Sequence, residues 1–252
     1  MTQQNNTSWG EVSEWYNGVI QSEDSYQRQV ILPHLERLIK IEKNDALLDL
    51  MCGSGFFAHE FALKGTDVSG ADISPELIAI AKRHAHRNEK YVVAPSDNIT
   101  FADKSFDKII IVLALQNIQN IDGTILECQR VMKQNGTLHI VLNHPAFRIP
   151  EHSSWEFDEK AQTQFRAIDK YMSETHSLIR MHPGARMTEV TISFHRPLQM
   201  YVKTLRKFDF AITGLEEWIS HKKSDSGPRA SAENSARKEF PLFMYLEARK
   251  IS

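Results

Sequence analysis

The stretch ALLDLMCGSG, residues 46–55, decides the fold class of this chain. Its first half is a short apolar run, which is typical of a buried strand, and its second half is a turn rich in glycine. Residues 56–63 that follow are predicted to form a helix, which Gly65 stops. A strand that turns through glycines into a helix predicts the first unit of an alternating α/β fold.

The alternation of strand and helix continues to residue 143. A second strand is predicted at 67–71, and SPE at residues 74–76 is a strong helix start, so a helix is expected to about His86. Asp122 is expected to cap a further helix. Other strands are predicted at 91–93, 108–113 and 137–142. This order predicts a doubly wound parallel sheet.

The flanking segments differ from this core. Residues 1–44 have the apolar spacing of helices. Alternation stops after Pro150, and residues 178–181 and 190–194 are predicted to pair as a hairpin across 182–184. A helix opened by Pro197 and strands at 211–219 and 242–248 are expected to complete the sheet. We therefore divide the chain into an N-terminal helical segment (1–44), an α/β core (45–150), an inserted cap (151–196) and the C-terminal part of the core (197–252).

Composition excludes several classes of protein. The hydrophobic fraction of 41% and the charged fraction of 25% are ordinary for a globular protein. The net charge of −2 provides no basic field that would attract nucleic acid. The longest apolar run, residues 109–115, is far shorter than the roughly 20 residues of a membrane span. Residues 1–15 are polar and do not resemble a secretory signal.

The cysteines and histidines indicate no metal. Cys52 and Cys128 are too few for a disulfide scaffold or a thiolate zinc site, and they suit a reducing cytoplasm. Cys52 is read as a packing residue rather than a nucleophile. No grouping of His, Asp and Glu along the chain has the spacing of a metal site. We expect no metal cofactor and a cytoplasmic location.

The glycine turn and two acids predict a nucleoside site. Gly53 and Gly55 let the backbone approach a ligand closely. Asp72 ends the next strand, 17 residues after Gly55, where an acid accepts hydrogen bonds from ribose hydroxyls. Asp49 lies on the strand before the turn, and its charge would repel a pyrophosphate. A cationic ligand, an amino group or a sulfonium, suits this carboxylate better than a dinucleotide does.

Four segments together resemble class I S-adenosylmethionine-dependent methyltransferases of the type 11 kind. ALLDLMCGSGFFAHEFA is similar to the first motif of that family, and SGADISPELIAIAKRH to the second. SDNITFADKSFDKIIIVLALQNI is similar to the third and fourth, and LECQRVMKQNGTLHIVL to the segment around the fifth strand. The resemblance implies a Rossmann-like, mostly parallel seven-stranded sheet whose last strand is antiparallel. It implies S-adenosyl-L-methionine as cofactor and S-adenosyl-L-homocysteine as product.

The resemblance also implies roles at the methionine end of the cofactor. Asp49 would orient the turn and the methionine amino group, while Gly53 and Gly55 would admit the methionine moiety. Leu113 would lie under the cofactor after the fourth strand. Tyr16, from the leading helix, would close over the methionine end.

At the nucleoside end, the resemblance implies that Asp72 holds the ribose and that Ile73 lies beside the adenine. Asp97 would reach the adenine amino group, with the backbone near Ser96. The chain departs from many relatives by having Pro95 where they carry an acid. The adenine contact, Asp97 or Ser96, therefore stays open.

The acceptor is expected to be a small molecule. Methyl transfer from a sulfonium is a direct displacement, which needs a base only if the acceptor must lose a proton. His144, after the fifth predicted strand, and His195, at the end of the cap, are the candidates for that base. QNI at 116–118 is not the Asn/Asp-Pro-Pro-aromatic motif of many nucleic-acid methyltransferases, which argues against DNA. An inserted cap that closes over the site suits a small molecule.

Two other functions stay open. A protein or RNA acceptor could be gripped by the basic residues of the segment 219–240, which is predicted to be a solvated loop. These residues are Lys222, Lys223, Arg229, Arg237 and Lys238. The other alternative is a nucleoside-cofactor binder without methyl transfer, either a sensor or a nicotinamide oxidoreductase. The oligomeric state, monomer or homodimer, is left open.

Overall fold

A computed structural model describes residues 12–42, 44–180 and 190–251 of the chain. Its centre is a seven-stranded sheet in the order β10-β11-β5-β4-β1-β2-β3. The strands are β1 (Ala46–Leu50), β2 (Asp67–Asp72), β3 (Glu89–Val93), β4 (Phe106–Val112), β5 (Met132–Asn143), β10 (Phe210–Trp218) and β11 (Phe243–Lys250). Neighbours from β5 to β3 pair in parallel, whereas β11 is antiparallel to both β5 and β10. The predicted doubly wound sheet with an antiparallel last strand is confirmed.

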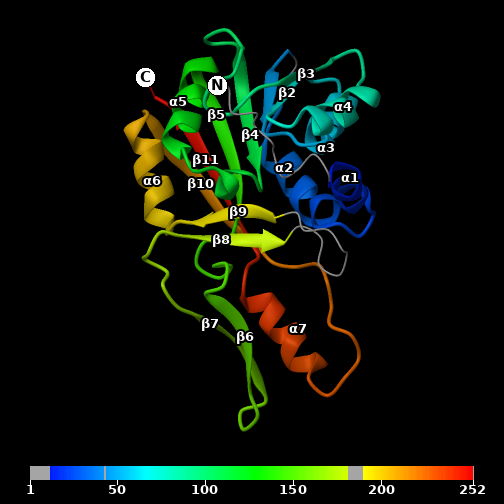
Figure 1. The fold of residues 1–252 in the computed structure, drawn as a ribbon, viewed down its shortest axis with the longest axis vertical. Helices are drawn as coiled ribbons and strands as arrows, with labels where there is room; N and C mark the ends of the chain where they lie inside the picture. The colour runs from blue at the N-terminus through cyan, green and yellow to red at the C-terminus, as the bar shows by residue number, and fades with distance from the viewer. Residues whose placement is uncertain (1–11, 43, 181–189, 252) are drawn as a thin grey trace.

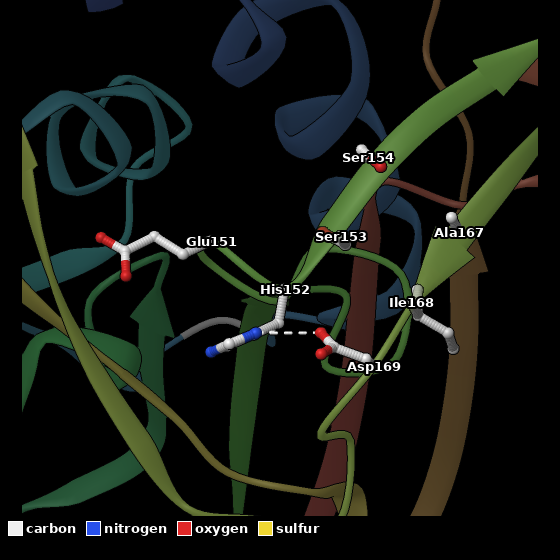
Figure 2. A pocket seen from close by; sticks show the side chains of 7 residues that line it. All are labelled: Glu151, His152, Ser153, Ser154, Ala167, Ile168 and Asp169. Atoms are coloured by element: carbon white, nitrogen blue, oxygen red, sulfur yellow. Dashed lines mark hydrogen bonds and ion pairs between the residues drawn. The ribbon is translucent and has the colours of Figure 1, made fainter.

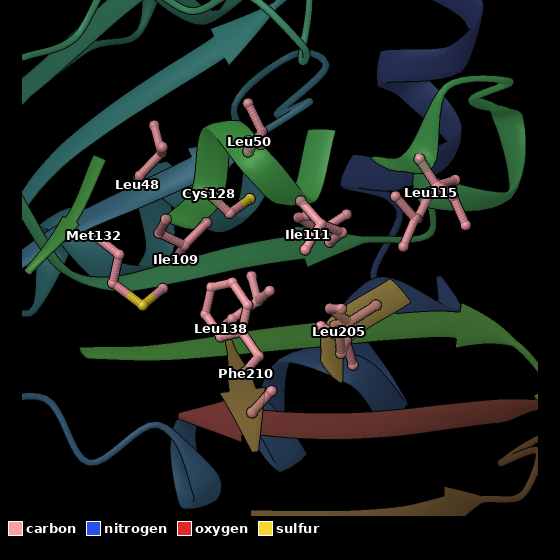
Figure 3. Packing of buried hydrophobic residues seen from close by; sticks show 14 of the residues in the cluster. Leu48, Leu50, Ile109, Ile111, Leu115, Cys128, Met132, Leu138, Leu205 and Phe210 are labelled. Carbon is pink, nitrogen blue, oxygen red and sulfur yellow. The ribbon is translucent and has the colours of Figure 1, made fainter. Parts of the chain in front are cut away.

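Helices cover both faces of this sheet (Figure 1). α5 (Ile121–Val131) and α6 (Leu198–Lys207) lie on one face. α3 (Phe56–Leu63), α4 (Pro75–Arg83) and the N-terminal helices lie on the other. Figure 3 shows the first layer, where Ile109 and Ile111 of β4 meet Cys128 of α5 and Leu205 of α6. Because parallel strands are covered on both sides, β4 is apolar without interruption from Ile109 to Val112, as the sequence indicated.

The helix starts follow their capping residues. The Ser74 hydroxyl accepts the Leu77 N–H at 3.3 Å, and Pro75 occupies the first helical position of α4, as expected. The expectation that Asp122 caps α5 is wrong. Asn120 is the cap, because its side-chain oxygen accepts the Gly123 N–H at 3.0 Å. Asp122 lies in the first turn of α5 and pairs with Lys207 of α6 at 2.5 Å.

The described part of the N-terminal segment is helical, as predicted. α1 (Ser13–Gln21) is followed by a π-helix, η1 (Gln27–Ile31), that continues into α2 (Leu32–Leu38). The Leu32 N–H donates to the Gln27 carbonyl, five residues back. Pro33 comes next and has no N–H to donate, which interrupts the α-helical hydrogen-bond pattern at this point. No described helix has the length and apolar character needed to cross a membrane.

The predicted cap region contains two hairpins. β8 (Thr175–Arg180) and β9 (Val190–His195) pair in antiparallel fashion, as expected, and their turn at 182–184 lies outside the described residues. β6 (Ser153–Asp158) and β7 (Thr163–Ile168) form a second hairpin that was not predicted. Its turn has no glycine. Instead the Asp158 carboxylate accepts the N–H groups of Lys160 and Ala161, at 2.8 and 3.0 Å.

The prediction of a loop throughout 219–240 is wrong, because α7 (Ala230–Glu239) occupies half of it. Only Ala236 of this helix is buried, so the sequence carries no apolar period that would reveal it. The preceding Arg229 fastens the helix to the β6–β7 hairpin. Its guanidinium lies 4.3 Å from the ring centroid of Phe157 and forms an ion pair with Glu159. Figure 1 shows α7 beside this hairpin, at the end of the molecule away from the sheet.

Candidate functional site

Asp49 is the most deeply buried acid at the carboxyl edge of the sheet. It lies on β1 and is 2% exposed, and its Oδ2 accepts the Ala58 N–H of α3 at 3.1 Å. Burial raises the pKa of Asp49 to about 7, and the nearby charge of Asp72 adds to the rise. Among the described residues, no positively charged side chain pairs with this carboxylate, so the position suits a cationic ligand.

The turn after β1 has the backbone geometry that requires glycine. Gly53 has φ +55° and Gly55, the N-cap of α3, has φ +82°. Met51 and Leu113 also adopt positive φ, +63° and +52°, at the ends of the adjacent strands β1 and β4. Strained residues of this kind gather at ligand sites, where the surrounding structure holds them.

Asp72 joins the end of β2 to the glycine turn. Its two carboxylate oxygens accept the N–H groups of Gly53 and Ser74, each at 2.9 Å. Burial raises the pKa of Asp72 as well. Ile73, the next residue, is partly exposed beside it. The two acids on which the sequence argument depended therefore flank one turn.

Tyr16 of α1 covers this turn. A small cavity of about 30 Å³, roughly the size of one water molecule, lies between Tyr16, Asp49, Gly53 and Leu113. Burial and the charges of Asp72 and Asp49 raise the pKa of the Tyr16 hydroxyl, so it stays protonated. The structure thus brings together four of the five residues expected at the methionine end, and the fifth, Gly55, does not line this cavity. Gln27, Phe56 and Phe57 also line the cavity and were not predicted.

Ser96 and Asp97 have structural partners in α5 and at its N-cap. Ser96 Oγ shares a hydrogen bond of 2.8 Å with Thr124 Oγ1. Asp97 Oδ2 accepts the side-chain N–H of Asn120 at 3.0 Å. Neither residue lines the small cavity. Their adenine contacts stay a prediction.

His144 and His195 are both engaged in hydrogen bonds. His144 Nδ1 accepts the N–H groups of Ala146 and Phe147, at 3.2 and 3.3 Å, so Nε2 carries the proton that is donated to Glu217 at 2.6 Å. This arrangement leaves neither nitrogen to take a proton from an acceptor and favours a structural role. His195 Nε2 donates to the Tyr171 carbonyl at 2.8 Å, and burial lowers its pKa.

A second pocket, of about 310 Å³, lies at the base of the β6–β7 hairpin (Figure 2). His152 and Asp169 face each other in it, with His152 Nδ1 2.9 Å from Asp169 Oδ1. His152 also lies close enough to His195 for its charge to lower the pKa of that residue. The sequence offered no motif for this pair, because 17 residues and a hairpin separate its members.

The β8–β9 hairpin is fastened to the segment that follows β4. Arg196, directly after β9, donates from Nη2 to the carbonyl oxygens of Ile118 and Gln119, at 2.8 and 2.9 Å. That segment begins at Leu113, which lines the small cavity. The cap and the cavity therefore share one strand-end loop.

Three buried polar atoms on the segments that surround Asp49 lack hydrogen-bond partners among the described residues, although none of their residues lines the cavity itself. They are Asn17 Oδ1 on α1, Ser54 Oγ in the glycine turn and Gln116 Oε1 after β4. Unpaired buried polar groups are rare and costly. Their presence on the three segments that surround Asp49 fits a site built for a polar ligand.

Tyr91 of β3 packs against Gly55 of the glycine turn and against Gly70 of β2. Sequence analysis did not predict this residue. A Cβ on Gly55 would lie 2.7 Å from the Tyr91 hydroxyl. A Cβ on Gly70 of β2 would lie 2.5 Å from the Tyr91 ring and 2.9 Å from Cys52 Sγ. Burial, with Asp49 and Asp72, raises the pKa of Cys52, which agrees with a packing role.

The sheet order, with the glycine turn at the end of its central strand, defines a domain of the class I S-adenosylmethionine-dependent methyltransferases. Residues 48–140 match the family model described as "Methyltransferase domain". The family resemblance noted in the sequence is confirmed, and the cofactor of the class is S-adenosylmethionine.

Named relatives cover part of the chain. Over 146 residues it is 29% identical to demethylmenaquinone methyltransferase of Tropheryma whipplei, covering 54% of this chain and 60% of the relative. It is 35% identical over 101 residues to ubiquinone biosynthesis O-methyltransferase of Pelagibacter ubique, covering 39% of this chain and 42% of the relative. The chain thus spans about half the length of these curated relatives.

Solved structures extend the similarity of fold. An S-adenosylmethionine dependent methyltransferase from Mesorhizobium loti has a TM-score of 0.70 at 22% identity. The alignment covers 86% of this chain and 96% of that one.

Proposed function

We propose that this protein transfers the methyl group of S-adenosylmethionine to a small-molecule acceptor by direct displacement. The observation that carries the proposal is Asp49, a buried carboxylate whose pKa lies near 7 beside the glycine turn. A ligand with a positive charge would compensate the burial of this acid. When bound, S-adenosylmethionine supplies a methyl group on a positively charged sulfur.

Different residues around the glycine turn bind different parts of the ligand. Asp49 holds α3 through Ala58 and faces the cationic end of the ligand. Asp72, fixed by the N–H groups of Gly53 and Ser74, accepts the ribose hydroxyls with its remaining lone pairs. Tyr16 covers the methionine end and keeps water away from the reacting methyl group.

We assign the binding site of the methyl acceptor to the cap region. Arg196 ties the β8–β9 hairpin to the loop that begins at Leu113, and the 310 Å³ pocket lies at the base of the neighbouring hairpin. For an acceptor that must lose a proton, His152 is the base. Asp169 accepts from Nδ1, which leaves Nε2 free to accept a proton. The curated relatives are named for quinone biosynthesis, so a hydroquinone is the first acceptor to try.

Titration with ligands tests the cofactor assignment. We expect S-adenosylmethionine and S-adenosylhomocysteine to bind in isothermal titration calorimetry and NAD not to bind. Tight binding of NAD without binding of either adenosyl compound would overturn the assignment. A cytoplasmic location is part of the proposal, and the free thiols of Cys52 and Cys128 agree with a reducing compartment.

A transfer assay tests the acceptor side. Radiolabelled methyl from S-adenosylmethionine is followed into hydroquinones, catechols and small amines, and separately into protein and RNA. His152→Gln is expected to lower kcat for a hydroxyl acceptor and to leave S-adenosylhomocysteine affinity unchanged. His176→Gln, at an exposed histidine of β8, is the matched control. Label in protein or RNA alone would refute a small-molecule acceptor.

A further inference from the structure

A group of three potential metal ligands lies on the face of the sheet that carries α3. His59 comes from α3, His86 from the turn after α4, and Glu89 begins β3. One ligand atom from each lies within 4.8 Å of the other two. His59 Nδ1 is 3.1 Å from Glu89 Oε1, and the two imidazole rings stack with centroids 5.0 Å apart.

Glu89 is an unusual member of this group, because its side chain is only 1% exposed. Its Oε2 accepts the Tyr91 hydroxyl at 2.6 Å, and its Oε1 accepts the His86 backbone N–H at 2.9 Å. Within the described residues, no lysine or arginine lies within ion-pair distance of Glu89, and its nearest side-chain partner of this kind is His59. A buried carboxylate is costly unless it is paired or coordinates a metal.

We propose that His59, His86 and Glu89 bind a divalent first-row transition metal ion, with Zn²⁺ as the representative. Two imidazoles and one carboxylate are a ligand set that Zn²⁺ uses, with bonds of about 2.0–2.2 Å. Ligand atoms of a tetrahedral site with such bonds are roughly 3.3 Å apart. His86 is exposed and His59 is 31% exposed, so modest side-chain rotations bring the atoms from 4.8 Å to that separation.

The surroundings of the carboxylate match those of a metal ligand. Ligating carboxylates are themselves held by hydrogen bonds from a second layer of residues, and Tyr91 and the His86 N–H do this for Glu89. The exposed side of the imidazoles leaves a coordination position for water. These three residues do not line the cavity around Asp49, so the ion has no part in the methyl transfer.

The same residues connect the ion to the cofactor turn. The Tyr91 hydroxyl that holds Glu89 lies against Gly55, the N-cap of α3, and His59 belongs to that same helix. A bound ion would therefore join α3, the α4–β3 turn and β3 directly behind the glycine turn. Its role would be to stabilise this part of the fold.

Zinc binding by tag-free full-length protein tests the proposal. ZnCl₂ is titrated in competition with a chromophoric chelator, and no methyl-transfer readout is needed. We expect His86→Ala to weaken Zn²⁺ binding at least tenfold. His84→Ala, which removes an exposed histidine two residues away, is the matched control and is expected to change the affinity less than twofold.

A spectroscopic measurement identifies the ligands. With CoCl₂, the wild type and His84→Ala should show the visible absorption of a tetrahedral nitrogen and oxygen site, and His86→Ala should lose it. A thiolate charge-transfer band would assign the ion to a cysteine instead. Equal zinc affinity in the two histidine variants, or no saturable binding by the wild type, would overturn the proposal.

Discussion

Lowering the pH from 8 to 6 should weaken S-adenosylmethionine binding about tenfold through one carboxyl group, Asp49. Burial and the charge of Asp72 raise the pKa of Asp49 to about 7 in the free protein. The group is then about 91% ionised at pH 8 and about 9% ionised at pH 6. If the ligand binds the ionised form, the apparent affinity follows this fraction, which corresponds to a loss of about 1.4 kcal/mol.

Isothermal titration calorimetry at pH 6, 7 and 8 measures this effect. The variant Asp49→Asn keeps an oxygen for the Ala58 N–H and cannot ionise, so its affinity should be lower at pH 8 and lose the pH dependence assigned to Asp49. The ligand's own amino group titrates equally in both proteins, so the difference between them reports Asp49. The reasoning is refuted if wild type and variant show the same change in affinity between pH 6 and pH 8.

Four further outcomes follow from the same contacts. Asp72→Ala should weaken S-adenosylhomocysteine binding by about 1–3 kcal/mol, or about 5- to 150-fold, and unchanged affinity in calorimetry would remove Asp72 from the site. Because folding raises the pKa of Asp49, wild type should lose about 2 kcal/mol of stability in total as the pH rises from 5 to 7. Asp49→Asn should not show this loss in urea unfolding. Burial lowers the pKa of His139 to about 3, so as the pH falls the unfolded chain binds this proton before the folded protein does. The stability of the wild type should therefore fall between pH 6.5 and pH 4, and that of His139→Gln should fall less. Gly70→Ala should cost about 1–3 kcal/mol in the same assay, because the new Cβ meets the Tyr91 ring at 2.5 Å, and a neutral result would contradict that packing.

The sheet could be predicted from sequence because its signals are local. Most of the parallel strands contain a short apolar run, such as 91–93 in β3 and 109–112 in β4, and a turn or a helix cap follows within a few residues. The β6–β7 hairpin could not be predicted, since its turn uses the Asp158 side chain and a non-glycine residue with φ +51°, Gln162. α7 was missed for another reason. Its residues carry no apolar period, and Arg229 before it contacts residues that are distant in sequence, Phe157 and Glu159.

The candidate site divides in the same way. Asp49 and Asp72 could be found because they end strands next to a glycine turn, where the order of the chain fixes their neighbourhood. Residues that act through contacts between distant segments gave no such signal. His152 finds Asp169 only when the hairpin closes, and Tyr91 reaches Gly55 only when β3 joins the sheet. A propensity or a spacing rule contains no information about such pairs.

The contact of Tyr91 with Gly70 limits how this sequence can evolve. Gly70 has an ordinary strand conformation, so the tyrosine and Cys52, rather than the backbone, exclude a larger residue there. A lineage that places alanine or serine at position 70 must first have reduced the ring at position 91. Among descendants of a common ancestor, the two positions are therefore expected to change together and in that order.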